Sequence, residues 1–198
     1  MIPPFNHSNV LPPFLGEQLS QDLASPYRTT SLELVQRLGS SLERRALLLQ
    51  FFALRDALRA GGFVEGFMWI NGSFTEDVET HRAAAPQDID VVFFTRAPVD
   101  CETAQAVKER MAANPALFVR QQCKQRFRCD FFVVDLAKAP EKLVAETRYW
   151  YGLFSHRRGD HVWKGMLQLP MDSDDAAALT MLHNAASTEQ GDGDVAST

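Results

Sequence analysis

Two aspartates one residue apart, Asp88 and Asp90, open an apolar run that continues to Phe94. Side chains in a strand alternate between its two faces, so both carboxylates point the same way. Two like charges on one side of a strand end repel each other and are costly to bury. A divalent cation relieves this repulsion, because Mg²⁺ (or Mn²⁺) prefers carboxylate oxygens and keeps waters and substrate phosphates as further ligands. The pair therefore predicts a metal site.

A glycine-serine pair precedes the aspartates. Gly72 and Ser73 directly follow a strand that we expect over residues 66–70. Glycine permits a tight turn and the close approach of another group. Backbone N–H groups and the Ser73 hydroxyl, at the start of a helical turn, would form a small anion site. A phosphate-binding turn beside a carboxylate pair is the combination that binding of a nucleoside triphosphate requires.

A third carboxylate is expected on a later strand, over residues 126–134. In that register Lys124, Arg126, Arg128 and Asp130 share a polar face, whereas Cys123, Phe127, Cys129, Phe131 and Val133 share an apolar one. Asp130 is the favoured third acid. Asp135, at the end of the strand, stays open as the alternative, and a turn or a helix cap would also explain it. Arg126 and Arg128 would either neutralise phosphate charge or pair with surface acids.

Two helices are expected before the first strand. Thr30 and Ser40 are the predicted N-caps, each with a glutamate three residues later, and Gly39 ends the first helix. The second helix carries apolar residues at spacings of three and four and ends at Gly61. Its arginines are interpreted as a solvated face; they are Arg44, Arg45, Arg55 and Arg59.

The later chain supplies the remaining elements. Helices are expected over residues 101–113 and 139–151, and a late strand over residues 162–170. The unbroken apolar run of residues 89–94 implies cover on both faces of the sheet. The pattern therefore predicts an α/β (α+β) fold, with a small mixed sheet flanked by helices.

The chain has 198 residues, which suits one domain with additional segments at its ends. Residues 1–28 contain five prolines and are predicted to form an extended arm that lies across the domain or a partner subunit. Residues 29–186 would form the domain. Residues 187–198 lack large apolar side chains and are predicted to be a disordered tail.

Composition narrows the functional classes. The net charge of −5 argues against a general nucleic-acid or membrane-surface binder, although a local basic groove is compatible with it. Three cysteines without a CxxC pair argue against a disulfide framework and a structural zinc site. No signal peptide and no membrane span are expected, so the predicted location is the cytoplasm.

These residues resemble the nucleotidyltransferase superfamily that includes DNA polymerase β, and its minimal bacterial members most closely. The shared pattern is a strand, Gly72-Ser73, a short helix, Asp88-x-Asp90 and a later acid, matched here by Asp130. It covers roughly residues 63–135. The arm sequence IPPFNHSNVLPPFLG, with SPY after it and YWYGLFSHRR later, also resembles an uncharacterised bacterial branch of that superfamily.

The resemblance implies a Mg²⁺-dependent, two-metal transfer of a nucleoside monophosphate to a hydroxyl of a protein, an RNA or a small molecule. All three acids would be metal ligands, and Gly72 and Ser73 would hold the outgoing phosphates. It also implies help from a partner protein or from dimerisation. The alternative is a catalytically inactive member of the fold that serves as a binding or antitoxin-like regulatory module.

Two features depart from the family pattern. Glu76 and Asp77 are acidic where a triphosphate would come near, and the gap before Asp88 is longer than usual. The acidic pair favours the inactive alternative, whereas the intact acid trio favours the enzyme.

The second half of the chain offers two further candidate clusters. The cationic cluster of residues 155–164 would be a clamp if it folded over the cleft, but a solvated loop is the favoured interpretation. The aromatic residues 149–154 could stack a base, but core packing is favoured for them.

Overall fold

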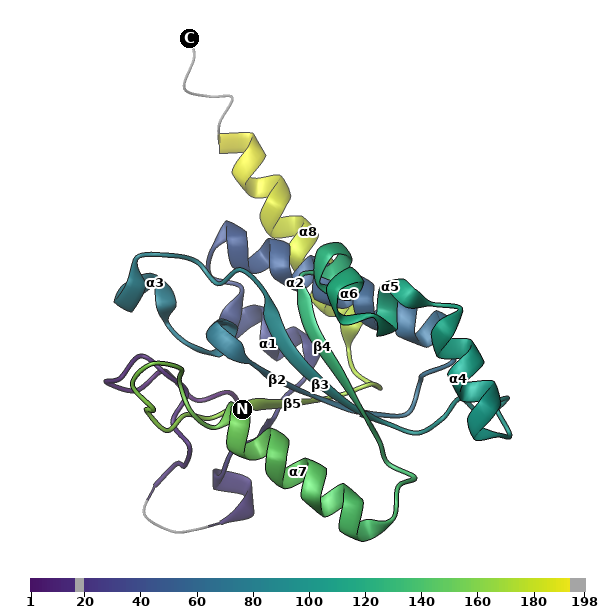
Figure 1. Cartoon of the computed structure of the whole chain (residues 1–198). Coiled ribbons are helices and arrows are strands. Elements are labelled where there is room, and N and C mark those ends of the chain that lie inside the picture. The colour runs from purple at the N-terminus through teal and green to yellow at the C-terminus, as the bar shows by residue number, and fades with distance from the viewer. Residues whose placement is uncertain (17–19, 193–198) are drawn as a thin grey trace.

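The computed structural model describes residues 1–16 and 20–192, with side chains described to residue 187. A five-stranded sheet lies at its centre, in the order β1-β5-β2-β3-β4 (Figure 1). The strands are β1 (Tyr27–Arg28), β2 (Gly66–Asn71), β3 (Ile89–Thr95), β4 (Cys129–Asp135) and β5 (Leu167–Pro170). β2 is antiparallel to β3 and β5, whereas β3–β4 and β1–β5 are parallel pairs. The predicted α/β fold with a mixed sheet is therefore confirmed.

Helices cover both faces of the sheet (Figure 1). One face carries most of them: α1 (Ser31–Leu38), α2 (Leu42–Ala60), α4 (Ala104–Ala112), α5 (Pro115–Phe118), α6 (Arg120–Phe127) and α8 (Asp175–Asp192). The opposite face carries α7 (Pro140–Phe154). The short α3 (Val78–Arg82) and two 3₁₀ helices, Gln21–Leu23 and Gly72–Thr75, lie in the connections. Among the described residues, no helix has the length and apolar character needed to cross a bilayer.

The strand β3 shows why both faces need cover. Ile89, Val91 and Phe93 belong to the larger core cluster, under α1, α2 and α8. Val92 and Phe94 belong to a second cluster, which contains residues of α7. All five side chains are at most 2% exposed, as the unbroken apolar run predicts.

The predicted strand over residues 126–134 begins too early. Residues 120–127 form α6, Arg128 follows with a left-handed φ of 52°, and the strand starts at Cys129. Cys123 and Phe127, one helical turn apart, are the buried residues of α6. Arg126 and Arg128 therefore do not alternate with Asp130 on a strand face, and the shared polar face was a wrong prediction.

Other boundaries differ by smaller amounts. Thr30 caps α1 as predicted, accepting a hydrogen bond from the Glu33 amide, but α2 is capped by Ser41 and not by Ser40. The helices expected over 101–113 and 139–151 are confirmed as α4 and α7, and the late strand shrinks to β5. α8 continues to Asp192, so residues 187–192 lie in a helix; residues 193–198 are outside the described part of the chain.

The N-terminal arm lies against the domain of its own chain. Val10 and Leu11 are fully buried, and β1 adds to the edge of the sheet beside β5. The Asn9 carbonyl accepts a hydrogen bond of 2.9 Å from the Asp77 amide, and the Leu11 carbonyl accepts one of 2.7 Å from the Gly165 amide. The arm therefore contacts the segments that flank the glycine-serine turn.

The arginines of α2 are not uniformly solvated, and the predicted solvated face is wrong for two of them. Arg44 is 1% exposed and donates to Glu79 at 2.6 and 2.9 Å. Arg55 is fully buried and donates to Asp175 at 2.8 and 2.9 Å and to the Pro170 carbonyl at 3.0 Å. Their partner acids lie 35 and 120 residues away, so the helical pattern alone does not indicate them.

Arg55→Met tests this buried ion pair. Loss of the guanidinium leaves Asp175 with Arg59 as its remaining arginine partner, and breaking a buried pair on one side costs about 3–5 kcal/mol. We expect urea denaturation to show a loss of that size in the free energy of unfolding. Arg126→Met, at an exposed position of α6, should change it by less than about 0.5 kcal/mol. Equal free energies of unfolding for the two variants would contradict a stabilising ion pair between Arg55 and Asp175.

Candidate metal and nucleotide site

The register of three strands brings the candidate acids together. Asp90 of β3 pairs with Asn71 of β2 on one side and with Asp130 of β4 on the other. Asp88 lies just before β3 and, two residues from Asp90, on the same side of the chain. Asp135 pairs with Thr95 at the far end of β4, about 17 Å away at the usual rise per residue. Asp130 is therefore the third acid that lies beside the pair.

The glycine-serine turn packs directly on Asp90. The 3₁₀ helix Gly72–Thr75 follows β2, and the Asn71 side chain accepts from the Gly72 amide at 2.6 Å and donates to the Phe154 carbonyl at 2.5 Å. Gly72 has a φ of +77°, and a Cβ there would lie 2.1 Å from Asp90 Oδ2. Only glycine therefore permits this close approach of turn and carboxylate.

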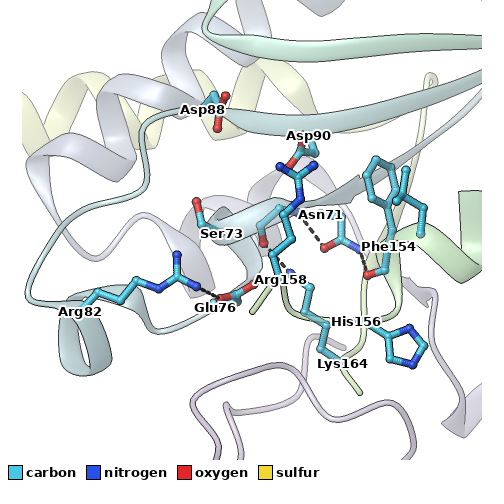
Figure 2. A pocket seen from close by; sticks show the side chains of 12 residues that line it. Asn71, Ser73, Glu76, Arg82, Asp88, Asp90, Phe154, His156, Arg158 and Lys164 are labelled. Carbon is cyan, nitrogen blue, oxygen red and sulfur yellow. Dashed lines mark hydrogen bonds and ion pairs between the residues drawn. The ribbon is translucent and has the colours of Figure 1, made fainter. Parts of the chain in front are cut away.

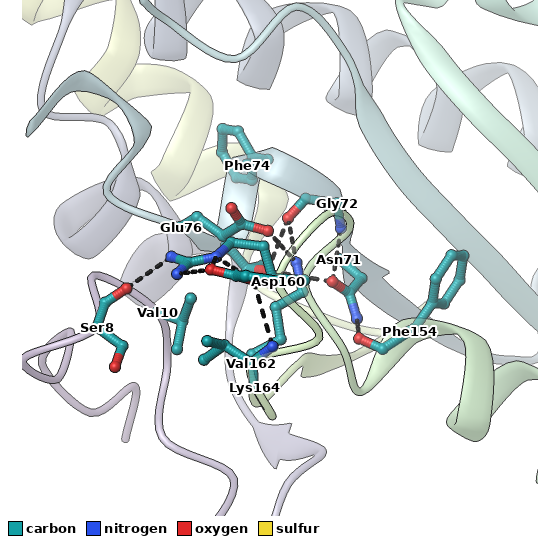
Figure 3. Close-up of polar contacts among 12 residues, drawn as sticks. Ser8, Val10, Asn71, Gly72, Phe74, Glu76, Phe154, Asp160, Val162 and Lys164 are labelled. Atoms are coloured by element: carbon teal, nitrogen blue, oxygen red, sulfur yellow. Dashed lines mark hydrogen bonds and ion pairs between the residues drawn. The ribbon is translucent and has the colours of Figure 1, made fainter. Parts of the chain in front are cut away.

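A buried ion pair supports the turn from below (Figure 3). The Lys164 ammonium donates to Glu76 Oε1 at 2.6 Å and to the Gly72 carbonyl at 2.8 Å, and both side chains are at most 5% exposed. Burial lowers the pKa of Lys164, and the charge of Glu76 opposes that shift. Asp77 caps α3 by accepting from the Thr80 amide at 3.3 Å. The acidic residues after Gly72-Ser73 therefore have structural partners.

An open cleft of about 200 Å³ lies at this end of the sheet (Figure 2). Its lining combines the turn, the aspartates and a group of cationic side chains: Asn71, Gly72, Ser73, Glu76, Arg82, Asp88, Asp90, Leu153, Phe154, His156, Arg158 and Lys164. The cationic cluster of residues 155–164 is therefore not simply a solvated loop. His156 and Arg158 reach the cleft, whereas Arg157 is held by Asp160 and by the Ser8 carbonyl of the arm.

Asp90 is the acid of the site whose charged form is least favoured by its surroundings. The pKa of Asp90 is raised to about 6, mainly by burial and further by the charges of Asp88 and Asp130, while Arg158 and Lys164 oppose the shift. Within the described residues the Asp90 carboxylate accepts no hydrogen bond and forms no ion pair within 4.0 Å, although Arg158 and Lys164 act on it at longer range. A hard divalent cation would relieve this repulsion, so the chemistry of the three carboxylates fits Mg²⁺ or Mn²⁺.

The other two acids are already paired with cations of α6. Arg120 donates to both oxygens of Asp130, at 2.5 and 2.6 Å, and Lys124 pairs with Asp88. Across the part of the chain that the structure describes, no three His, Cys, Asp or Glu side chains converge as a ready-made metal site. Metal binding at the three carboxylates would therefore require Arg120 and Lys124 to move.

The structure separates the two arginines that were candidates for phosphate binding. Arg126 lies over the Phe127 ring and lines a different cavity, beside Ala57 and Asn114. Arg128 donates to the Gln87 carbonyl at 3.1 Å, next to Asp88. Neither lines the cleft. The sequence patterns did not indicate Arg120, and they placed Lys124 only on the polar face of a strand. The spacing of four residues between the two would have been informative had a helix been predicted there.

The aromatic residues of α7 contribute mainly to packing, as favoured. Trp150 and Tyr151 pack on the second core cluster, and the Trp150 ring centroid lies 4.5 Å from that of Phe132. Tyr149 is 56% exposed. Phe154 is buried and contributes to the cleft wall.

Gly72→Ala tests the contact between turn and carboxylate. A left-handed residue with a side chain costs about 1–3 kcal/mol, and here the added methyl group also meets Asp90. We expect urea denaturation to show a loss of at least that size. Gly152→Ala in α7 is the matched control, because its Cβ meets no atom within 4 Å; there alanine should stabilise by about 0.5–1 kcal/mol. A Gly72→Ala variant as stable as the wild type would disprove the close contact.

The chain belongs to DUF6932, a family of unknown function, whose model matches residues 3–170. The matched span begins in the arm and ends with β5, so it contains all five strands and every candidate acid. No curated protein and no solved structure matches the chain. The residues matched by the family model therefore include the whole candidate site, but the family description assigns no reaction to it.

Proposed function

We propose that this member of DUF6932 is a Mg²⁺-dependent nucleotidyltransferase, which moves a nucleoside monophosphate from a nucleoside triphosphate to a hydroxyl of a protein, an RNA or a small molecule. The observation that carries the proposal is the strand register, which sets Asp90 between the glycine-serine turn and Asp130. A turn suited to phosphate and a carboxylate cluster suited to a divalent cation thus share one end of the sheet.

Asp88, Asp90 and Asp130 would hold Mg²⁺ (or Mn²⁺), which when bound neutralises triphosphate charge and lowers the pKa of an acceptor hydroxyl. The backbone and hydroxyl of the Gly72–Ser73 turn would hold the β- and γ-phosphates. Arg82 and Arg158, both exposed at the cleft, would offset the remaining negative charge.

The proposed transfer is an in-line displacement at the α-phosphorus. The acceptor oxygen forms a bond to the α-phosphorus, and the bond from that phosphorus to the bridging oxygen of the β-phosphate breaks, so pyrophosphate leaves with the electron pair. Asp130, which pairs with Asp90 at this end of the sheet, would accept the hydroxyl proton once Arg120 has left its carboxylate.

The size of the cleft is consistent with a site for phosphates. Pockets that enclose a whole drug-sized ligand measure about 300–1,000 Å³, whereas this cleft measures about 200 Å³. The triphosphate and its cations would fill it, and the nucleoside would lie over the rim beside Leu153, which is 44% exposed. The cleft would thus bind the triphosphate, and its rim would bind the nucleoside.

The second candidate function is a catalytically inactive member of the fold that acts as a binding or antitoxin-like regulatory module. The ion pairs of Asp130 with Arg120 and of Asp88 with Lys124 favour it, because acids neutralised by protein cations do not need a metal. The acidic Glu76 no longer favours it, since Lys164 neutralises that carboxylate. Metal-dependent nucleotide binding distinguishes the two functions.

Isothermal titration with a non-hydrolysable nucleoside triphosphate tests the proposed function. Binding by the wild type should require Mg²⁺, and Asp90→Asn should weaken it by about tenfold or more, because a central oxygen ligand loses its charge. Asp135→Asn, at the far end of the neighbouring strand β4, is the control and should stay within about twofold of the wild type. Binding that is equal with and without Mg²⁺, or equal in Asp90→Asn, would refute the metal site; no binding at all would favour the inactive module.

A further inference from the structure

The two basic residues of α6 that reach the acids lie one turn apart. Arg120 and Lys124 are four residues apart, so both project from the same side of the helix, about 6 Å apart along its axis. Arg120 also packs against a residue of the edge strand β4, with its Cζ 5.0 Å from the centre of the Phe132 ring. The pair therefore approaches the acids from the β4 edge of the sheet.

These ion pairs are asymmetric in their exposure. The side chains of Arg120 and Lys124 are 62% and 50% exposed, whereas those of Asp130 and Asp88 are 7% and 22% exposed. The carboxylates depend on a nearby cation, because burial makes their unpaired charge costly. The cations remain well hydrated, so they lose little when another cation replaces them at the carboxylates.

The segment around α6 is locally basic in an acidic protein. Residues 115–129 contain four of the chain's 20 lysines and arginines and no aspartate or glutamate, although the net charge of the chain is −5. A local surface of this kind attracts a phosphate group that the protein as a whole would repel. Arg82 and Arg158 line the cleft on the other side of the acids, and α6 does not contribute to that cleft.

We propose that Arg120 and Lys124 form a binding site for a phosphate group of the acceptor, and that this site opens when a divalent cation takes their place on Asp130 and Asp88. The inference rests on the proposed function and deepens it, because it assigns a phosphate-bearing acceptor. The phosphate at α6 is distinct from the triphosphate, which has its own cations in the cleft.

Replacement of Arg120 and Lys124 by a metal ion would couple binding of the metal ion to binding of the acceptor phosphate. A metal ion that displaces Arg120 and Lys124 frees their charge for the acceptor phosphate, and a bound phosphate in turn holds them away from the carboxylates. Each ligand therefore raises the affinity for the other by the same factor, as thermodynamic linkage requires. The ion pairs of the free protein are the resting state of this exchange.

The test compares Arg120→Gln/Lys124→Gln with Arg126→Gln, a control that removes a cation from the same helix without touching an acid. Free Mn²⁺ is followed by electron paramagnetic resonance during titration. Each exposed ion pair competes by up to about fivefold. The double variant should therefore bind Mn²⁺ more tightly, by roughly 3- to 25-fold, and the control should shift by less than about twofold.

The same proteins are then titrated with a short single-stranded RNA and with ribose 5-phosphate, with and without Mn²⁺. Wild type should bind one of them more tightly when Mn²⁺ is present, and the double variant should lose about tenfold or more of that affinity. A response to RNA alone identifies a nucleic-acid acceptor. A response to ribose 5-phosphate, with or without RNA, identifies a phosphate monoester as sufficient.

Three outcomes overturn the inference. The first is an unchanged Mn²⁺ affinity in the double variant. The second is a double variant that binds both Mn²⁺ and the phosphate ligands more weakly than the wild type. The third is a wild type whose affinity for RNA and for ribose 5-phosphate does not change when Mn²⁺ is added. The proposed function still stands in these cases if Asp90→Asn abolishes Mn²⁺ binding. Absence of Mn²⁺ binding in the wild type refutes the proposed function itself, so the two failures are distinguishable.

Discussion

The repulsion among three carboxylates at one end of the sheet is the constraint around which the candidate site is built. The pairing of β3 with β4 forces Asp90 and Asp130 side by side, and Asp88 adds a third charge. Each neighbouring segment supplies a cation in response: α6 supplies Arg120 and Lys124, and the loop after α7 supplies Arg158. The pKa of Asp90 is raised despite them, and the proposed Mg²⁺ would reduce the remaining repulsion.

The turn that completes the site depends on segments from distant parts of the chain. Lys164 joins the carbonyl of Gly72 to the carboxylate of Glu76, and the N-terminal arm bonds to Asp77 and Gly165 on either side of that pair. These contacts fix the turn in the position where Gly72 touches Asp90. Support of this kind would lower the cost of ordering the turn for the phosphates that it is proposed to bind.

Sequence patterns predicted the parts of the site that local chemistry determines. The apolar run before Asn71, the glycine-serine pair and the spacing of Asp88 and Asp90 gave two strands, a turn and two acids in their correct places. The sequence patterns gave wrong predictions where contacts with distant residues determine the local structure or the burial of a side chain. The strand predicted over residues 126–134 overlapped α6, because Cys123 and Phe127 lie on one side both of a strand and of a helix. The burial of Arg55 depends on Asp175, which lies 120 residues away.

The most direct test of the metal site is anomalous diffraction from crystals that contain Mn²⁺ and a non-hydrolysable nucleoside triphosphate. The account predicts a manganese peak at coordination distance, about 2.0–2.2 Å, from the carboxylate oxygens of Asp90 and Asp88, with Arg120 and Lys124 displaced and phosphates on the Gly72–Ser73 turn. A structure that contains the bound triphosphate but no manganese at Asp90, with both α6 ion pairs intact, would contradict it.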